Sequence, residues 1–223
     1  MIPSTLVLCS GGMKSAFLIA LAKKEVNRVG ILFINHGQEA VERERRATYD
    51  ICTHYGIHYG LTDTWDLDLS AVVPPGKNWP RFKLTLLLWY AVIWAREYEF
   101  ERIYFGPSFD DRREEATLKY VNEIRTLLDT AQPNFEPGAR GVRCAKVHID
   151  APLIKLTESR ILNLGETYAV PWELTWCCSK SNVIHCGTCA KCKRRQRAFI
   201  KAKLLDPTRY IKNTLEHERR KLL

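Results

Sequence analysis

The feature that most constrains the fold is a strand, a glycine turn and a helix at the start of the chain. Residues 5–9 (TLVLC) form an unbroken apolar run, typical of a strand buried on both faces of a parallel sheet. The turn SGGMKS follows at residues 10–15, and the helix-forming segment AFLIALAKKE comes directly after it. This order opens a βαβ unit, so the sequence predicts an α/β protein.

The same alternation continues through about the first 165 residues. We expect further strands at 28–35, 60–65, 102–105 and 144–149, and helices at 39–55, 81–98, 114–129 and 157–164, the last ended by Gly165. A basic helix at 190–205 and a short helix after Pro207 complete the chain. The pattern predicts a doubly wound, mostly parallel sheet with helices on both faces. We place a domain boundary near Val170, with residues 1–170 as the sheet domain and 171–223 as a small helical cysteine module.

Composition excludes several classes of protein. The chain has 223 residues, 46% hydrophobic and 26% charged, which suits a folded domain. The longest apolar stretch, 84–95, holds 12 residues, and a membrane-spanning helix needs ~20. The first residues carry neither a basic leader nor a small-residue cleavage site, so we expect no secretion signal. These observations predict a cytoplasmic protein without membrane association.

The net charge of +9 resides entirely in the last part of the chain. Residues 191–223 hold 12 Lys and Arg against three acids, whereas the first 190 residues hold 22 of each sign. Such a segment is compatible with contact to a polyanion: RNA, DNA or the phosphates of a nucleotide. The alternative is a solvated helix whose cations offset nearby metal-bound thiolates.

Five of the eight cysteines fall within residues 177–192. The run CGTCAKC supplies Cys186, Cys189 and Cys192 at a spacing that can place sulfurs ~2.3 Å from one tetrahedral zinc ion. The fourth ligand is Cys178 or Cys177. An iron–sulfur cluster, or His185 in place of one cysteine, are the alternatives. With four protein ligands the site would be structural.

The three remaining cysteines, Cys9, Cys52 and Cys144, stand alone in the sequence. Free buried thiols are their default interpretation.

The glycine turn suits an anion. Backbone N–H groups between a strand and a helix form a cradle for phosphate, and the helix dipole adds to it. Gly11 and Gly12 allow close approach, while Ser10 and Ser15 add hydroxyl donors. The turn has neither the Walker spacing nor the dinucleotide motif G-x-G-x-x-G. A plain strand-to-helix turn is the alternative.

SGGMKS resembles the SGGxDS pyrophosphate-binding (PP) loop of the N-type ATP pyrophosphatases. Within that superfamily the chain resembles the 7-cyano-7-deazaguanine synthase family over nearly its full length. The matching stretches are LVLCSGGMKSAFLIALAKK, ILFINHGQ, VPPGKN, IDAPLIKLTESRILNLGETYAVPWELTWCC and CGTCAKCKRRQRAF. The resemblance implies an adenine nucleotide α-hydrolase-like fold with a small zinc module.

The resemblance also implies a reaction. ATP adenylates the carboxylate of 7-carboxy-7-deazaguanine and releases pyrophosphate, ammonia displaces AMP to give the amide, and a second ATP drives dehydration to the nitrile. The implied cofactors are ATP, Mg²⁺ and a structural Zn²⁺, and a homodimer is expected. The implied ATP-binding residues are Ser10, Gly11, Gly12, Met13, Lys14, Ser15 and Lys77, and the implied zinc ligands are Cys178, Cys186, Cys189 and Cys192.

Three positions depart from the family pattern. Lys14 stands where SGGxDS has an acid, which reverses the charge beside the phosphates. The loop GPSFDDRREEA lacks the family's S-G-Y-P-D-C, although Asp111 matches its first acid; a solvated helix start is the alternative for this segment. Lys77 replaces an arginine and loses the bidentate fork. We take Lys14 and Asp111 as the candidate catalytic residues.

Three functions remain open at this point. The first is an ATP-dependent C–N ligase that joins a deazaguanine-type carboxylate to ammonia or another amine, with His36 near the nucleotide or simply in an exposed loop. The second is a non-catalytic nucleotide- or partner-binding protein on the same fold, or a member repurposed, for example in antiviral defence, to modify a protein or nucleic acid. The third is a nucleic-acid binder that uses the basic C-terminus.

Overall fold

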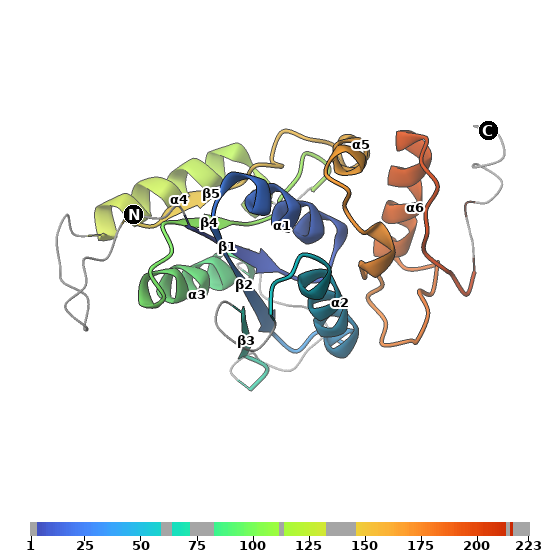
Figure 1. Ribbon diagram of the computed structural model, residues 1–223, viewed down its shortest axis with the longest axis horizontal. Coiled ribbons are helices and arrows are strands. Elements are labelled where there is room, and N and C mark those ends of the chain that lie inside the picture. Colours follow the sequence, from blue (N-terminus) through green and yellow to red (C-terminus); the bar gives the residue numbers. More distant parts are fainter. Residues whose placement is uncertain are drawn as a thin grey trace.

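The computed structural model describes residues 4–58, 64–71, 83–111, 114–132, 146–212 and 215. Its centre is one parallel sheet of five strands in the order β3-β2-β1-β4-β5 (Figure 1). The strands are β1 (Ser4–Cys9), β2 (Arg28–Asn35), β3 (Thr64–Asp68), β4 (Arg102–Tyr104) and β5 (His148–Asp150). The predicted parallel α/β sheet is confirmed.

Helices cover both faces of the sheet, as the alternation predicts. One face packs against α1 (Met13–Glu25), α2 (Val41–His54) and α5 (Glu158–Thr167), and α6 (Ala190–Ala202) joins the same apolar cluster beside α5. The other face packs against α3 (Lys83–Glu97) and α4 (Leu118–Ala131). In Figure 1, α6 lies at one end of the molecule, beyond α2 and α5. Among the described residues, no helix has the length and apolarity needed to cross a bilayer.

The unbroken apolar character of β1 follows from its central position. Leu6 points into the cluster with α3 and α4, and Val7 points into the cluster with α1 and α5. Both side chains are fully buried. Because alternate residues of a strand face opposite sides of the sheet, a strand covered on both sides needs apolar residues throughout.

The predicted free thiols agree with the structure where it describes them. Cys9 and Cys52 are buried and make no disulfide, and burial raises the pKa of both thiols. Cys144 lies outside the described residues.

The edge strands differ most from the sequence expectation. β3 begins at Thr64, and the expected strand residues before it lie outside the described part of the chain. Its outer position explains the difference, because the exposed side chains of Asp66 and Asp68 give the strand no continuous apolar run by which its bounds could be recognised. At the other edge, β5 covers only three residues.

The helix expected after Pro207 does not form among the described residues up to 212. Instead, Asp206 holds the segment: Thr208 N donates to Asp206 Oδ1 at 3.1 Å, and Tyr210 Oη donates to Asp206 Oδ2 at 2.6 Å.

Gly165 does not end its helix, contrary to our expectation. α5 continues to Thr167, and Gly165 lies where the indole of Trp172 packs against the helix. A Cβ atom at position 165 would lie 2.0 Å from Trp172 Cζ2. Trp172 in turn meets the ring of Phe199 on α6, with a centroid separation of 6.4 Å. The glycine therefore serves close packing between α5 and the cysteine module. The proposed boundary near residue 170 remains a prediction.

We expect Gly165→Ala to destabilise the protein by about 1–3 kcal/mol, since the methyl group overpacks a closed contact. Asn163→Ala, at an exposed position of the same helix, is the matched control. Thermal unfolding followed by circular dichroism checks this expectation. Equal melting temperatures for the two variants would contradict the packing role of Gly165.

Candidate active site and cysteine centre

A cavity of about 300 Å³ opens at the carboxyl ends of β1, β2 and β4. β1 and β4 are neighbours in the sheet, but the chain leaves β1 toward β2 and returns to β4 from the other side. Such a switch point leaves a crevice between the loops that follow the two strands. The cavity is therefore where an open parallel sheet is expected to bind a ligand.

Residues 10–15 form one wall of this cavity. Gly11 has a left-handed backbone (φ +66°), and a Cβ there would lie 2.5 Å from the carbonyl oxygen of Glu44 on α2. Ser15 Oγ accepts a hydrogen bond from Ser10 N at 3.1 Å, and α1 begins directly after Gly12. The residues of this loop that line the cavity are Ser10, Gly12, Met13, Lys14 and Ser15. Gly11 is not among these lining residues; its left-handed backbone and its close approach to α2 set the shape of the loop.

Lys14 is held by oxygen atoms from two other elements. Its Nζ is paired with Asp111 Oδ2, and lies 3.4 Å from Ser108 Oγ and 3.9 Å from Glu158 Oε1. The loop after β4 supplies Asp111 and Ser108, and the first turn of α5 supplies Glu158. Sequence reasoning found Lys14 and Asp111 but gave no sign that they touch.

Arg194 of α6 ties the same two carboxylates together. Its Nη1 lies 3.0 Å from Asp111 Oδ1, and its Nε lies 3.0 Å from Glu158 Oε1. Burial raises the pKa of Glu158 although Arg194 and Lys14 act against it. Burial also acts to raise the pKa of Asp111, but the charge and hydrogen bond of Lys14 outweigh burial and lower it.

A second cation from α6 faces the cavity further along. Lys191 Nζ lies 3.4 Å from Glu44 Oε1, and Gln38 Nε2 donates to Glu44 Oε2 at 3.0 Å. Sequence reasoning missed Lys191, Arg194 and Glu158 as cavity residues. Lys191 and Arg194 are three residues apart in the basic helix, so one face of that helix carries both. That spacing is the signal that could have found them.

Apart from Lys83 and Arg195, the remaining cavity wall is apolar or neutral. Leu8, Ile34, Leu84, Leu87 and Phe105 line it. His36 also lines it and is buried, so the alternative of an exposed loop histidine is wrong. Burial, with Lys83 and Lys191 nearby, lowers the pKa of His36 to about 3, so its imidazole is neutral at pH 7. Lys77 lies outside the described residues.

Two acids close to Asp111 in the sequence, Glu115 and Asp110, accept hydrogen bonds from the backbone at the starts of helices. The Glu115 carboxylate accepts hydrogen bonds from the backbone N–H of Leu84 (3.3 Å) and Thr85 (3.0 Å) at the start of α3. Asp110 Oδ2 accepts from Glu158 N at 2.6 Å at the start of α5. Glu115 is buried. The solvated helix start that we considered for this segment therefore does not describe Asp111 or Glu115.

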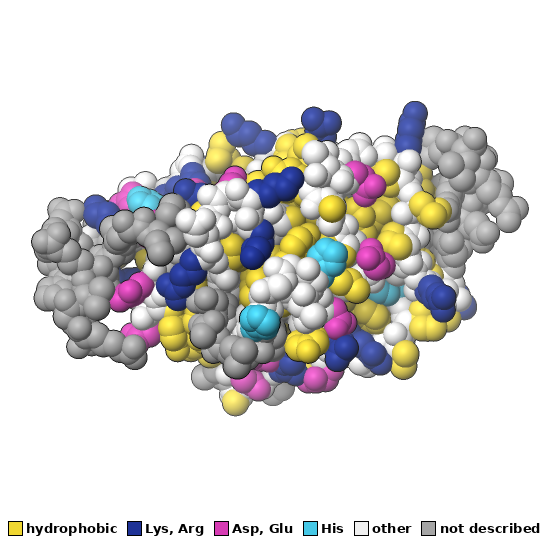
Figure 2. Space-filling model, in the orientation of Figure 1, with side chains coloured by type: hydrophobic (Ala, Val, Ile, Leu, Met, Phe, Trp, Pro, Cys, Tyr) yellow, Lys and Arg dark blue, Asp and Glu magenta, His cyan; other side chains and the backbone are white. Residues whose placement is uncertain are grey.

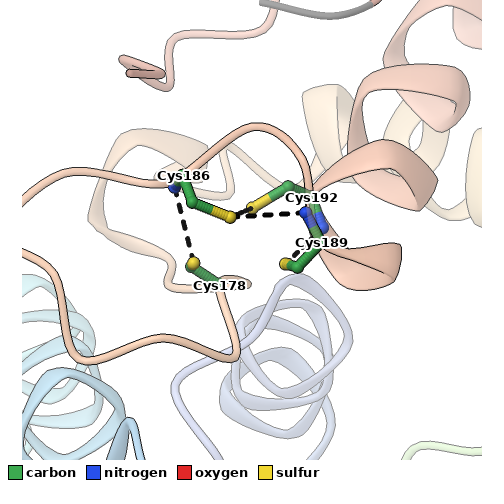
Figure 3. Close-up of side chains that lie close together, drawn as sticks. All are labelled: Cys178, Cys186, Cys189 and Cys192. Atoms are coloured by element: carbon green, nitrogen blue, oxygen red, sulfur yellow. Dashed lines mark hydrogen bonds between the residues drawn. The ribbon is translucent and has the colours of Figure 1, made fainter. Parts of the chain in front are cut away.

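Four cysteines converge beside the cavity. Figure 3 shows their side chains pointing toward one another, and their sulfur atoms all lie within 4.8 Å of each other. Cys189 caps the N-terminus of α6, and Cys178 reaches in from the loop after η2 (Trp172–Leu174). The four are Cys178, Cys186, Cys189 and Cys192. A tetrahedral zinc–thiolate site has neighbouring sulfurs ~3.8 Å apart, and Cys186 Sγ lies 3.9 Å from Cys192 Sγ. The group could hold zinc or an iron–sulfur cluster.

The two alternative metal ligands, Cys177 and His185, make contacts outside the four-cysteine cluster. Cys177 Sγ lies 4.0 Å from Cys192 Sγ, but Cys177 also lines the cavity. His185 stacks on Trp176 with ring centroids 4.0 Å apart, and its Nε2 accepts a hydrogen bond from Cys177 N at 3.1 Å. This nitrogen of His185 is therefore already engaged in a hydrogen bond with the backbone.

Fold and site together define a class: a doubly wound α/β protein with a cavity at the switch point of its sheet, a glycine turn after the first strand in the cavity wall, and a four-cysteine centre beside it. The family model described as "Queuosine biosynthesis protein QueC" matches residues 4–203. The chain therefore belongs to this family. The expected ATP-dependent ligase type of enzyme is confirmed by this membership.

Individual relatives agree with the family assignment. The chain is 30% identical to the 7-cyano-7-deazaguanine synthase of Methanothrix thermoacetophila, over 91% of this chain and 96% of that protein. It is 32% identical to the synthase of Chlorobium phaeobacteroides strain BS1, over 92% of this chain and 95% of that protein. Among solved structures, the U34-tRNA thiolase NcsA from Methanococcus maripaludis aligns with 99% of this chain and 68% of its own, with a TM-score of 0.48 and 14% identity.

We expect the purified protein to contain metal and Cys178→Ser to lose most of it, because three sulfurs hold the ion less tightly than four. Cys177→Ser is the matched control and should keep the metal. Elemental analysis by mass spectrometry measures the content, and the visible absorbance of an iron–sulfur cluster distinguishes it from zinc. Equal metal loss in the two variants would contradict the ligand set.

Proposed function

We propose that this protein uses ATP to adenylate the carboxylate of a 7-deazaguanine-type base and passes the acyl group to ammonia or another amine. The observation that carries the proposal is the shared cavity: the turn at residues 10–15, the loop bearing Asp111 and the cations of α6 all line it. Family membership and the names of the relatives support the class of base.

The bond changes balance without a nucleophilic side chain. A carboxylate oxygen of the base attacks the α-phosphorus of ATP, and pyrophosphate leaves. The nitrogen of the amine then attacks the acyl carbon, AMP leaves, and the nitrogen loses a proton. The chain's part is to orient the phosphates and to stabilise the charge on the departing pyrophosphate. Nitrile formation would need a second ATP for dehydration of the amide.

The cavity lining has the two kinds of surface that a nucleotide needs. Serine hydroxyls and the start of α1 favour phosphate, with Lys191 and Arg194 as further cations. The apolar side chains of Leu8, Ile34 and Phe105 favour a flat base. As ATP-binding residues we propose Ser10, Gly11, Gly12, Met13, Lys14 and Ser15, with Lys77 from outside the described residues.

Zinc is the metal that we propose for the cysteine centre. Four sulfurs that all lie within 4.8 Å of one another fit it, with Cys178, Cys186, Cys189 and Cys192 as ligands and no open position for chemistry. The centre would fix the start of α6 and so hold Lys191 and Arg194 against the cavity. Thiolate ligands require a reducing compartment, which supports the predicted cytoplasmic location.

Mg²⁺ has a poorer fit to the protein itself. Among the described residues that line the cavity, the carboxylates of Asp111, Glu158 and Glu44 all have cationic partners already. We therefore derive no step through a protein-held magnesium ion. The ion would arrive, if at all, on the phosphates of ATP.

Part of the basic C-terminal segment is directed toward the cavity, where nucleotide phosphates are proposed to bind. Lys191 and Arg194 face the cavity, and the buried Arg195 pairs with Asp206. On the face seen in Figure 2, Lys and Arg side chains are scattered among Asp and Glu and form no single patch. We therefore favour nucleotide phosphate over RNA or DNA as the polyanion. The homodimer stays an expectation from the family.

A non-catalytic, nucleotide-binding role is the second candidate. The observation that favours it is the pairing of Lys14 with Asp111, which engages both candidate catalytic side chains with each other. Such a protein would bind ATP without releasing pyrophosphate.

Incubation with ATP, ammonia and 7-carboxy-7-deazaguanine tests the proposal. We expect pyrophosphate release and an amide product by mass spectrometry. Ser10→Ala should slow release roughly 10²-fold if its hydroxyl stabilises the leaving pyrophosphate, and Ser181→Ala, at an exposed position, should match the wild type. ATP binding without any pyrophosphate release would overturn the ligase and favour the second candidate.

A further inference from the structure

We propose that Lys14 is a built-in cation that takes the place of a divalent metal between Asp111 and Glu158. The phosphate end of the cavity then binds metal-free polyphosphate at least as tightly as its Mg²⁺ complex. This inference rests on the proposed function, because it specifies the form of the nucleotide that the same site accepts.

The surroundings of the Lys14 ammonium are those of a bound cation. Oxygen atoms of Asp111, Ser108 and Glu158 lie around Nζ, with the last two at 3.4 and 3.9 Å. Carboxylate and hydroxyl oxygens are the ligands that hard divalent cations prefer. The ammonium is covalently attached to the first turn of α1, so its presence does not depend on the metal concentration.

Arg194 removes the remaining attraction for a metal. It lies 3.0 Å from an oxygen of each carboxylate. Two carboxylates therefore face two fixed cations, and their charges cancel. A divalent ion entering between them would meet two like charges at close range. Asp111 Oδ2 also accepts a hydrogen bond from Ser108 N at 2.9 Å, which further occupies its lone pairs.

The charge of the whole lining points the same way. The described lining residues include Lys14, Lys83, Lys191 and Arg194, together with Arg195, which pairs with Asp206 outside the lining. They face the carboxylates of Glu44, Asp111 and Glu158. An acid in place of Lys14 would remove one positive charge from this lining and add one negative charge, a change of two units beside the carboxylates of Asp111 and Glu158. A lining made more negative in this way favours polyphosphate that arrives with a metal.

The experiment measures binding of two probes, inorganic pyrophosphate and the α,β-methylene analogue of ATP, by calorimetry. Each titration is run with excess Mg²⁺ and again with EDTA, on the metal-loaded full chain and with EDTA levels that leave the cysteine centre filled. The proteins are the wild type, Lys14→Asp and Lys14→Met. Lys23→Asp reverses a charge on the same helix at an exposed position outside the cavity and is the matched control.

We expect the wild type and Lys23→Asp to bind at least as tightly in EDTA as in Mg²⁺. Lys14→Asp should bind at least about tenfold more tightly with Mg²⁺ than without it, a difference of about 1.4 kcal/mol. Lys14→Met should bind more weakly in both conditions without acquiring a preference for Mg²⁺.

Other outcomes separate the inference from the proposed function. Binding by the wild type only in Mg²⁺ would overturn the inference and leave the ligase standing. No change of preference in a folded Lys14→Asp would also overturn it. Failure of the folded wild type to bind either probe in either condition would instead overturn the nucleotide site itself. The wild-type titrations decide the question even where Lys14→Asp does not fold.

Discussion

The left-handed backbone at Gly11 is the constraint on which the site depends. Its α-carbon lies against the carbonyl oxygen of Glu44 on α2, closer than any side chain would allow. Its own carbonyl oxygen accepts a hydrogen bond from Trp176 N at 2.8 Å, at the entry to the cysteine module. One residue therefore joins the first strand, the second helix and the C-terminal module. The shape of the turn and the position of the module are set together.

The cavity is consequently a joint product of distant parts of the chain. The turn after β1 supplies Ser10 and Lys14 to its lining, the loop after β4 supplies Asp111, and α6 supplies Lys191 and Arg194. The cysteine centre begins α6 and thereby fixes the two cations that lie within its first turns. A metal held by these four cysteines would therefore affect ligand binding through the position of α6, without taking part in the chemistry. The basic charge of the C-terminus is also partly explained, because some of it is directed inward.

Local patterns in the sequence predicted the central strands, the glycine turn and three of the four clustered cysteines, because each depends on neighbouring residues, whereas the fourth, Cys178, followed from the family resemblance. The centres of β1 and β2 are continuous apolar runs because both of their faces are covered, and the absence of polar alternation in the sequence indicates this directly. The bounds of the edge strand β3 were not predicted accurately, because its exposed face carries Asp66 and Asp68. Gly165 was misinterpreted as a helix end, since its reason is a tertiary contact with Trp172 that no local pattern contains. The ion pairs of Lys14 were hidden for the same reason: its partners stand 97 and 144 residues away along the chain.

The account stands on one claim, that the turn at residues 10–15 holds the phosphates of a nucleotide. A crystal structure of the protein with the α,β-methylene analogue of ATP tests it most directly. The account predicts the triphosphate within hydrogen-bond distance of the backbone N–H groups of this turn, with Lys191 and Arg194 beside it and the base against the apolar wall. A triphosphate bound elsewhere, for example in the groove lined by Arg43 and Arg209 on the other side of Trp176, would contradict it.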